Sequence, residues 1–269
     1  MAREGGKLLC VALLAAIACA PGVTADEPRH PADVYVQHPV ARELLSDVVL
    51  WANFEQGPEP VWGARFGDGT EAVTGDYVVA PGLVGQAFVS EDRSLCRYPT
   101  AGNLDLTRPG AISLWVCPVA WDRSGPTGIR NNLFGTNYSD LGYFGVNRMA
   151  ARAEGGRQVQ DDMLYFYAEK FPGANRTYIQ LGDTLGPKWA NGKWHLVVVN
   201  WKGPLFEVSI DGGGLKSGNL GAAVTGEGVQ ELLVGGCQER TLIDEFMVYR
   251  RPLDGAEISA IWSALADEE

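Results

Sequence analysis

Short runs of β-branched and aromatic residues recur along most of the chain, and Gly, Pro, Asn or Asp bounds each run. This pattern predicts a series of short β-strands. The predicted strands are 48–54, 86–89, 94–98, 111–118, 132–135, 143–147, 163–167, 178–181, 195–201, 205–210, 232–234 and 243–249. The pair Asp211-Gly212, directly after one of them, is typical of a hairpin turn. No repeat of fixed period is present, which argues against a propeller or a solenoid.

One amphipathic helix is predicted at the end of the chain. Asp254 and Glu257 have the spacing of a capping box. One apolar stripe follows at helical spacing, formed by Ile258, Ile261, Trp262 and Leu265. About a dozen strands and one terminal helix predict an all-β protein. We expect a two-sheet antiparallel sandwich with one short C-terminal α-helix packed on it through this stripe.

The N-terminus has the features of an export signal. Arg3 and Lys7 precede the apolar stretch 8–20, which is shorter than the ~20 residues of a membrane-spanning helix. Small residues before Asp26 predict cleavage after Ala25. The segment around Cys19 weakly resembles a bacterial lipobox, but Ala stands where Leu is usual, so ordinary cleavage is favoured over lipidation.

These features predict three parts: a signal peptide at 1–25, a lead-in segment at 26–47 and one β domain at 48–266. No later stretch is long enough to cross a membrane, so we expect a protein that is secreted, periplasmic or on the cell surface. The formal net charge of −11 opposes general nucleic-acid binding and docking to anionic lipid.

Three cysteines remain beyond the signal peptide, namely Cys96, Cys117 and Cys237. Export permits disulfides, but an odd number allows at most one pair. Two interpretations stay open: three small buried thiols, or one disulfide and one thiol. No C-x-x-C motif suggests zinc or redox chemistry. His195, in a predicted strand, is expected to be a hydrogen-bonded structural residue.

Aromatic residues supply the candidate ligand surface. Tyr165 and Tyr167 alternate with Leu164 and Phe166, so the two tyrosines share one face of a strand. If Leu164 and Phe166 face the core, the tyrosines face outward, where aromatic rings can stack on sugars. Predicted loops add further candidates, namely Trp121, Tyr138, Tyr143 and Trp189. The alternative is that all six residues pack locally and bind nothing.

Six segments, in order from about residue 48 to 265, resemble a LamG-like jelly roll of the concanavalin A-like lectin/glucanase superfamily. They are the opening strand 48–54, Pro81-Gly82-Leu83-Val84-Gly85-Gln86-Ala87, the segment 104–118 with Ile112-Ser113-Leu114-Trp115, Gly192-Lys193-Trp194-His195, Ile210-Asp211-Gly212, and Ile243-Asp244-Glu245 with the helix after it. The resemblance implies a jelly-roll sandwich. It implies no single function, because this fold carries lectins, adhesion domains and hydrolases. The leader and the style of the motifs indicate a bacterial protein.

The resemblance also implies a structural calcium ion and pairing of the first and last strands. Glu55 would then approach Asp244, and the two carboxylates would share an oxygen-ligand site. Asp244 and Glu245 are neighbours in a strand, so only one of them is expected to face the core, where a carboxylate needs a partner. The alternative is that Asp244 accepts backbone N–H bonds and Glu55 is solvated.

The glucanases of the superfamily use a Glu-x-Asp-x-Glu strand motif, which sets carboxylates on one face for acid/base work. This chain contains no Glu-x-Asp, and Asp161-Asp162 and Asp244-Glu245 have the wrong spacing for one face. We therefore expect a non-catalytic exported binding domain for carbohydrate or another extracellular ligand. A structural or adhesion protein with protein partners is the alternative, and a glycoside hydrolase ranks third.

Overall fold

The computed structural model describes residues 39–55, 57–58, 72–121, 129–149, 152–154, 157–160, 163–181 and 189–266. The predicted signal peptide with Cys19, most of the lead-in segment and the pair Asp161-Asp162 lie outside the described residues. No helix in the described ranges combines the length and the apolar character that a membrane span requires.

Eight described strands form an antiparallel sheet, here called sheet A. The last strand, β17, lies beside β6 on one side, and on its other side β4 pairs with its beginning and β1 with its end. The strands of sheet A, in spatial order, are β15 (Lys216–Asn219), β14 (Leu205–Ile210), β13 (His195–Lys202), β6 (Gly110–Pro118), β17 (Thr241–Tyr249), β4 (Gln86–Ser90) and β3 (Val79–Pro81), with β1 (Val48–Ala52) paired to β17. The pairing of the first and last predicted strands is thus confirmed.

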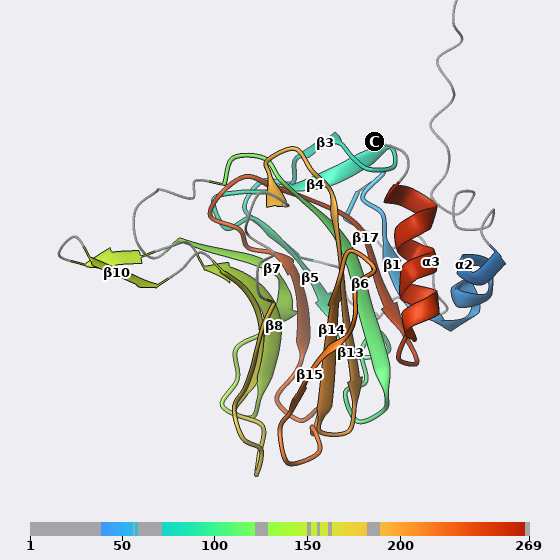
Figure 1. Ribbon diagram of the computed structural model, residues 1–269, viewed down its shortest axis with the longest axis vertical. Coiled ribbons are helices and arrows are strands. Elements are labelled where there is room, and N and C mark those ends of the chain that lie inside the picture. Colours follow the sequence, from blue (N-terminus) through green and yellow to red (C-terminus); the bar gives the residue numbers. More distant parts are fainter. Residues whose placement is uncertain are drawn as a thin grey trace, which may run out of the picture.

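Seven strands form a second antiparallel sheet, here called sheet B, which lies against sheet A (Figure 1). In spatial order they are β12 (Thr177–Gln180), β11 (Met163–Glu169), β8 (Tyr143–Met149), β7 (Arg130–Thr136), β16 (Glu231–Gly235), β5 (Leu95–Pro99) and β2 (Ala72–Thr74). A separate hairpin pairs β9 (Arg152–Glu154) with β10 (Arg157–Gln160). The predicted antiparallel two-sheet sandwich is confirmed.

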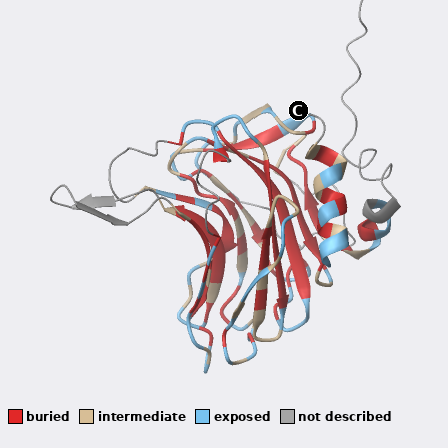
Figure 2. Cartoon of the chain, viewed as in Figure 1, coloured by how far each residue is buried: buried red, intermediate tan, exposed pale blue. Residues whose placement is uncertain are grey.

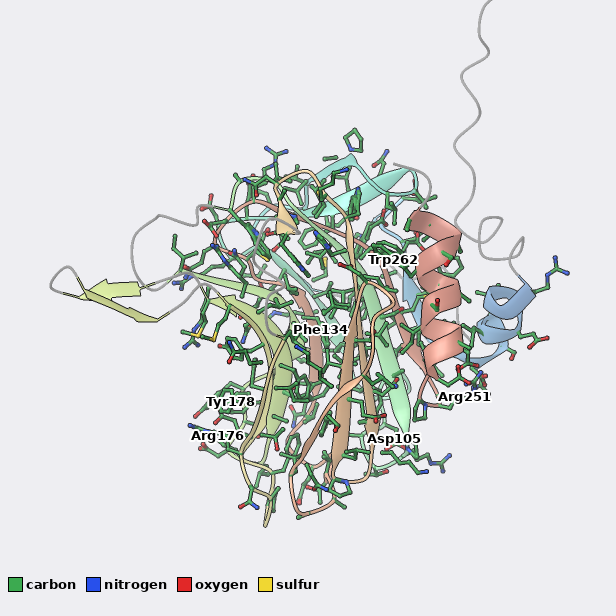
Figure 3. The ribbon with its side chains drawn as sticks, in the orientation of Figure 1. Asp105, Phe134, Arg176, Tyr178, Arg251 and Trp262 are labelled. Carbon is green, nitrogen blue, oxygen red and sulfur yellow. The ribbon has the colours of Figure 1, made fainter. Side chains whose placement is uncertain are left out.

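Two hydrophobic cores lie one behind the other. The larger core fills the space between the sheets and includes Phe134, Phe144 and Phe246. The smaller core lies between sheet A and the two helices, α2 (Pro39–Leu44) and α3 (Gly255–Ala266). In Figure 3, Phe134 lies between the sheets and Trp262 between sheet A and α3. Sheet A is therefore buried on both faces, which explains why β6 and β13 are apolar along almost their whole length.

The terminal helix forms as its sequence predicts. The Asp254 carboxylate accepts hydrogen bonds from the N–H groups of Ala256 and Glu257, both at 2.9 Å, and the Glu257 carboxylate accepts one from Asp254 N–H at 2.8 Å. Buried and exposed bands alternate along α3 in Figure 2. The stripe faces sheet A, although Trp262 is only partly buried and stacks on Trp115 with ring centroids 5.2 Å apart.

All twelve predicted strands are present, with ends within two residues of the prediction. The five strands that the sequence did not predict, β2, β3, β9, β10 and β15, have three or four residues each. Such segments are too short to show a two-residue alternation, so their pairing depends on neighbouring strands.

The three cysteines are buried thiols without a disulfide. This is the first of the two interpretations left open by the sequence. Burial raises the pKa of the Cys237 thiol to about 11, which keeps this side chain in its uncharged form at neutral pH.

Candidate functional site

Five tyrosine rings form a continuous row on the face of sheet B that points away from sheet A. We call this row the tyrosine surface; its members are Tyr138, Tyr143, Tyr165, Tyr167 and Tyr178. Consecutive ring centroids lie 4.8, 5.5, 6.0 and 5.9 Å apart in the order 138, 143, 167, 165, 178. Figure 3 shows Tyr178 on the side of sheet B opposite to α3.

Strand alternation produces the row. Leu164 and Phe166 are fully buried in the core between the sheets, so Tyr165 and Tyr167 point to the other face, as predicted. In the neighbouring strand β12, Tyr178 lies directly opposite Tyr167. The row therefore runs across the strands of sheet B, from the loop after β7 to β12.

Glycines make room for the central ring. Gly145 in β8 lies opposite Tyr167, and Gly135 in β7 lies opposite Gly145. A Cβ atom on Gly145 would come within 2.9 Å of the Tyr167 hydroxyl, and one on Gly135 within 3.5 Å. Two small residues thus leave a shallow space over β7 and β8 for the Tyr167 side chain.

A buried carboxylate orders one end of the row. Glu169 lies on the same face as Tyr165 and Tyr167 and is only 7% exposed. It accepts a hydrogen bond from the Tyr143 hydroxyl and forms an ion pair with Arg176. The Arg176 guanidinium in turn lies 5.3 Å from the ring centroid of Tyr178. Glu169 is therefore a positioning residue that connects Tyr143 to Tyr178 through Arg176.

Lys170 contacts the exposed end of the tyrosine surface, at Tyr138. The Lys170 ammonium lies 4.3 Å from the ring centroid of Tyr138 and 2.8 Å from an Asp140 carboxylate oxygen. The hydrogen bond from Lys170 lowers the pKa of Asp140, and both neighbours raise the pKa of Lys170. Lys170 and Arg176, the two cations that lie over rings of the tyrosine surface, are thus each paired with a carboxylate.

The exposure of the row is uneven. Tyr138 and Tyr178 are 66% and 51% exposed, and Tyr143 and Tyr167 are partly exposed. Tyr165 is only 8% exposed, because Tyr167 and Tyr178 flank its ring. The expectation that both Tyr165 and Tyr167 are strongly exposed is therefore wrong, because Tyr165 is buried and Tyr167 is only partly exposed, although the predicted face of the sheet is correct. Burial raises the pKa of the Tyr167 phenol to about 12.

Two of the predicted loop residues lie in the interior. Trp121 and Trp189 are 4% and 0% exposed and stack with centroids 5.8 Å apart. Trp189 also stacks on His195 at 4.1 Å, and the His195 ring bonds to Asp211 at 2.9 Å. The expectation that these tryptophans belong to an exposed surface is wrong, because both complete the packing at the sandwich end. His195 is a hydrogen-bonded structural residue, as expected.

Sequence reasoning missed Tyr178 and Glu169 as members of this site. Glu169 follows Tyr167 by two residues, so simple alternation places it on the same face. Tyr178 lies in a strand that was predicted, but its place next to β11 depends on strand order, which the local pattern does not contain.

The predicted carboxylate pair lies elsewhere, at the junction of β17 with β4 and β1. Two oxygen atoms of Asp244 accept hydrogen bonds from the N–H groups of Leu83 (3.0 Å), Val84 (3.2 Å) and Glu245 (2.8 Å). Glu55 accepts one from the N–H of Gln86 at 3.0 Å. A Cβ atom on Gly82 or on Gly85 would overlap these carboxylates, so only glycine allows so close an approach.

Both Asp244 and Glu245 are fully buried, whereas only one was expected to be. The expectation is wrong for two reasons. Sheet A is covered on both faces, and a bulge with a positive φ of 49° at Glu245 shifts the register of β17 against β6. Burial raises the pKa of both carboxyl groups well above the usual range, and the charge of Glu55 adds to the effect.

Hydrogen bonds from the backbone account for the burial of the Asp244 carboxylate without a metal ion. A carboxylate offers about four lone-pair positions, and backbone N–H groups use three of them here. Calcium takes six to eight oxygen ligands. Among the described residues, no three His, Cys, Asp or Glu side chains are grouped as a metal site. The side chains fit an anchor for the 82–85 turn, and calcium between Glu55 and Asp244 stays a prediction.

No protein-family model matches the chain, and no curated protein does. Solved structures with the same fold do match. One is domain 4 of AbnA, a GH43 extracellular arabinanase from Geobacillus stearothermophilus, in complex with arabinotriose. Its TM-score is 0.57 at 17% identity, and the match covers 81% of this chain and 98% of that one.

Receptor-binding domains of botulinum neurotoxins are also similar. The binding domain of neurotoxin DC, in complex with rat synaptotagmin II, matches with a TM-score of 0.62 at 12% identity, over 82% of this chain and 52% of that one. Another is a structure of botulinum neurotoxin type C, whose cell entry is described as dependent on interaction with two ganglioside molecules. It matches with a TM-score of 0.59 at 13% identity, over 83% of this chain and 52% of that one. At these identities the likeness shows a shared β-sandwich fold.

Proposed function

We propose that the chain is a non-catalytic carbohydrate-binding domain and that the tyrosine surface is its binding site. The observation that carries the proposal is the row of contacting rings across sheet B. Aromatic rings offer flat apolar faces with a polar rim, and such faces suit the C–H surfaces and hydroxyl groups of sugars. Consecutive centroids 4.8–6.0 Å apart provide contacts for more than one sugar unit.

The pairing of charges around the row favours a neutral glycan. Lys170 is paired with Asp140 and Arg176 with Glu169, so the two cations that lie over the rings are already engaged when a ligand meets the phenol hydroxyls and ring faces. The same pairing supports a role in binding and not in hydrolysis, because Glu169 is buried and engaged by Tyr143 and Arg176. A hydrolase needs two carboxylates that reach a glycosidic bond.

The similar folds support the proposal in a general way. The AbnA domain was solved with arabinotriose, and botulinum neurotoxin type C is described as interacting with two ganglioside molecules. The complex with synaptotagmin II favours the alternative, a domain whose partner is a protein. A tyrosine-rich surface also suits protein contacts, so the experiment must separate the two.

The test is a glycan array followed by calorimetric titration of the best neutral oligosaccharide. We expect Tyr167→Ala and Tyr178→Ala each to weaken binding by about tenfold, the equivalent of about 1.4 kcal/mol, and together to abolish it. Val78→Ala is the matched control, because Val78 is 42% exposed and lies beside β3 of sheet A. Unchanged affinity in the double variant, or an array without any neutral ligand, would overturn the proposal.

A further inference from the structure

An exposed cation lies on the same face of sheet B as the tyrosine surface. Arg130 is the first residue of β7, and it shares its face of the strand with Asn132, two residues further on. Asn132 lies opposite Asn147 of β8, which in turn lies opposite Tyr165 of β11. Residues paired in this way point to one side of a sheet. Arg130 therefore lies on the face that carries the tyrosine rings, two strands or roughly 10 Å from β11 at the usual strand spacing.

The Arg130 side chain is accessible to a ligand. It is exposed, and within the described ranges its guanidinium makes no ion pair and no hydrogen bond. Lys170 and Arg176 of the same face are each paired with a carboxylate, and Arg97 pairs with Glu231 further along sheet B at 2.9 Å. Among the described side chains of this face, Arg130 therefore contributes one positive charge that no neighbour compensates.

The charge of Arg130 acts on the rings next to it. Burial raises the pKa of both Tyr167 and Tyr178, and the positive charge of Arg130 opposes part of that rise at each phenol. An arginine whose charge reaches two ring hydroxyls is close enough to contact a ligand that lies across those rings. Guanidinium groups bind carboxylates and other oxyanions through charge-assisted N–H bonds, which are stronger than bonds between neutral groups. A ligand on the rings can therefore present an oxyanion to Arg130.

Exposed amides form the polar edge of the tyrosine surface on this side. Gln180 of β12 lies opposite Tyr165, and Asn132 lies along β7 between Arg130 and the level of the rings; both amides are exposed. An amide offers donors and an acceptor, which suit the hydroxyl groups of a sugar. The face thus changes from aromatic to polar within one row of residues, where the sugar unit next to a stacked one would lie.

We propose that Arg130 makes the tyrosine surface prefer a glycan with an anionic substituent, a carboxylate or a sulfate ester, beside the neutral unit that stacks on Tyr167 and Tyr178. The inference rests on the proposed function, because the rings must hold the glycan for its substituent to reach Arg130. It adds the class of ligand, a polysaccharide in which neutral and acidic units adjoin. The net charge of −11 repels a polyanion, so a glycan with few anionic groups suits this chain better than a fully charged polymer.

A glycan array tests the inference if each neutral oligosaccharide is printed beside the same oligosaccharide with one 6-carboxylate and with one 6-sulfate. We expect at least one of the two anionic forms to bind about three- to fivefold more tightly than the neutral form, which is the size of an exposed ion pair. Calorimetric titration of the matched ligands measures the ratio. The advantage should shrink as salt rises to about 1 M, where the screening length falls to ~3 Å.

Substitutions of Arg130 assign the advantage to this side chain. Arg130→Gln should remove it and leave the Kd for the neutral form unchanged, whereas Arg130→Lys should keep most of it. The side chain is exposed, so the fold should tolerate both changes. Lys202→Gln, which removes an exposed cation at the end of β13 in sheet A, is the control for the loss of one positive charge and should leave the advantage intact.

The outcomes separate this inference from the proposed function. Equal binding of the neutral and anionic forms, or an advantage that survives Arg130→Gln, would overturn the inference and leave binding of the neutral glycan in place. An array on which no form binds would overturn both. Binding of an anionic form that is unchanged in the Tyr167→Ala, Tyr178→Ala double variant would show charge attraction without the rings, and it would also overturn the inference.

Discussion

The outer faces of the two sheets differ in what covers them, although strand alternation builds both in the same way. The outer face of sheet A carries Trp51, Trp115 and Leu196, and α2 and α3 cover it. The outer face of sheet B carries the tyrosine surface, and no helix of the described chain packs on it. A tryptophan-rich face paired with an amphipathic helix serves stability, whereas a phenol-rich face remains available to a ligand.

The residues themselves reflect this difference. Trp115 on sheet A is 1% exposed, belongs to the smaller core and stacks on Trp262 of the helix. Tyr178 on sheet B is 51% exposed and lies beside Arg176. A phenol keeps its hydroxyl in water while its ring stays accessible, so tyrosine tolerates the exposed face better than a fully apolar ring does.

The largest expected effect comes from removing a side chain under the helix. Ile261→Ala should lower the free energy of unfolding by about 2–5 kcal/mol, because Ile261 is fully buried between α3 and sheet A. Urea unfolding measures the change. Ser259→Ala, at an exposed position of the same helix, is the control and should change stability by less than about 0.5 kcal/mol. Equal effects of the two variants would mean that the helix does not cover the sheet.

An alkaline titration should next separate half-exposed Tyr178 from Tyr249, which is buried in sheet A. Tyr167 has a pKa raised to about 12 by burial, so the folded state keeps this proton longer than the unfolded state, whose pKa is about 10. The stabilisation is complete below pH 10 and is lost as pH rises towards 12, by about 2–3 kcal/mol. Ultraviolet absorbance should show half-exposed Tyr178 ionising first, then Tyr167, and last Tyr143 and buried Tyr249, whose pKa values are raised further.

A titration in which Tyr249 ionised together with Tyr178 would contradict the buried environment of sheet A. Tyr249→Phe identifies its absorbance step, and Tyr178→Phe identifies the other. Each substitution keeps the ring and removes only the ionisable group, so the comparison does not depend on a change of packing.

Removal of calcium with a chelator tests whether an ion binds at the junction of β17 with β4 and β1. If an ion binds Glu55 and Asp244 in the folded state only, a tenfold excess over its Kd contributes about 1.4 kcal/mol, and a chelator should lower the melting temperature accordingly. Glu55→Gln should remove this response while the hydrogen bond to Gln86 keeps an oxygen acceptor. A melting temperature that does not respond to chelator would make the calcium prediction wrong and leave the backbone anchor as the role of both carboxylates.

The smallest expected effect on stability comes from truncating an exposed ring of the tyrosine surface. Tyr178→Ala should change the free energy of unfolding by less than about 0.5 kcal/mol, because half of the side chain is already in water. Thermal unfolding measures it, alongside the binding assay. A cost near that of Ile261→Ala would show that the tyrosine surface is a packing layer and not a binding surface.

Local sequence patterns determined much of this molecule. Alternation in 163–169 set the core face of Leu164 and the outer face of Tyr167, because successive strand residues point to opposite sides. Turn residues and apolar runs located twelve strands, and Asp254 with Glu257 located the helix start. These features depend on neighbours within a few residues, so a sequence contains them in full.

Only the tertiary structure decided which faces are covered. Trp121 and Trp189 have the sequence context of exposed loops, yet they stack inside the sandwich end. Asp244 and Glu245 alternate like any strand pair, yet both are buried because helices close the second face of sheet A and a bulge shifts β17. Tyr178 joins the tyrosine surface because β12 pairs with β11. Burial and neighbourhood across strands depend on contacts between residues far apart in the chain, and the local pattern does not determine them.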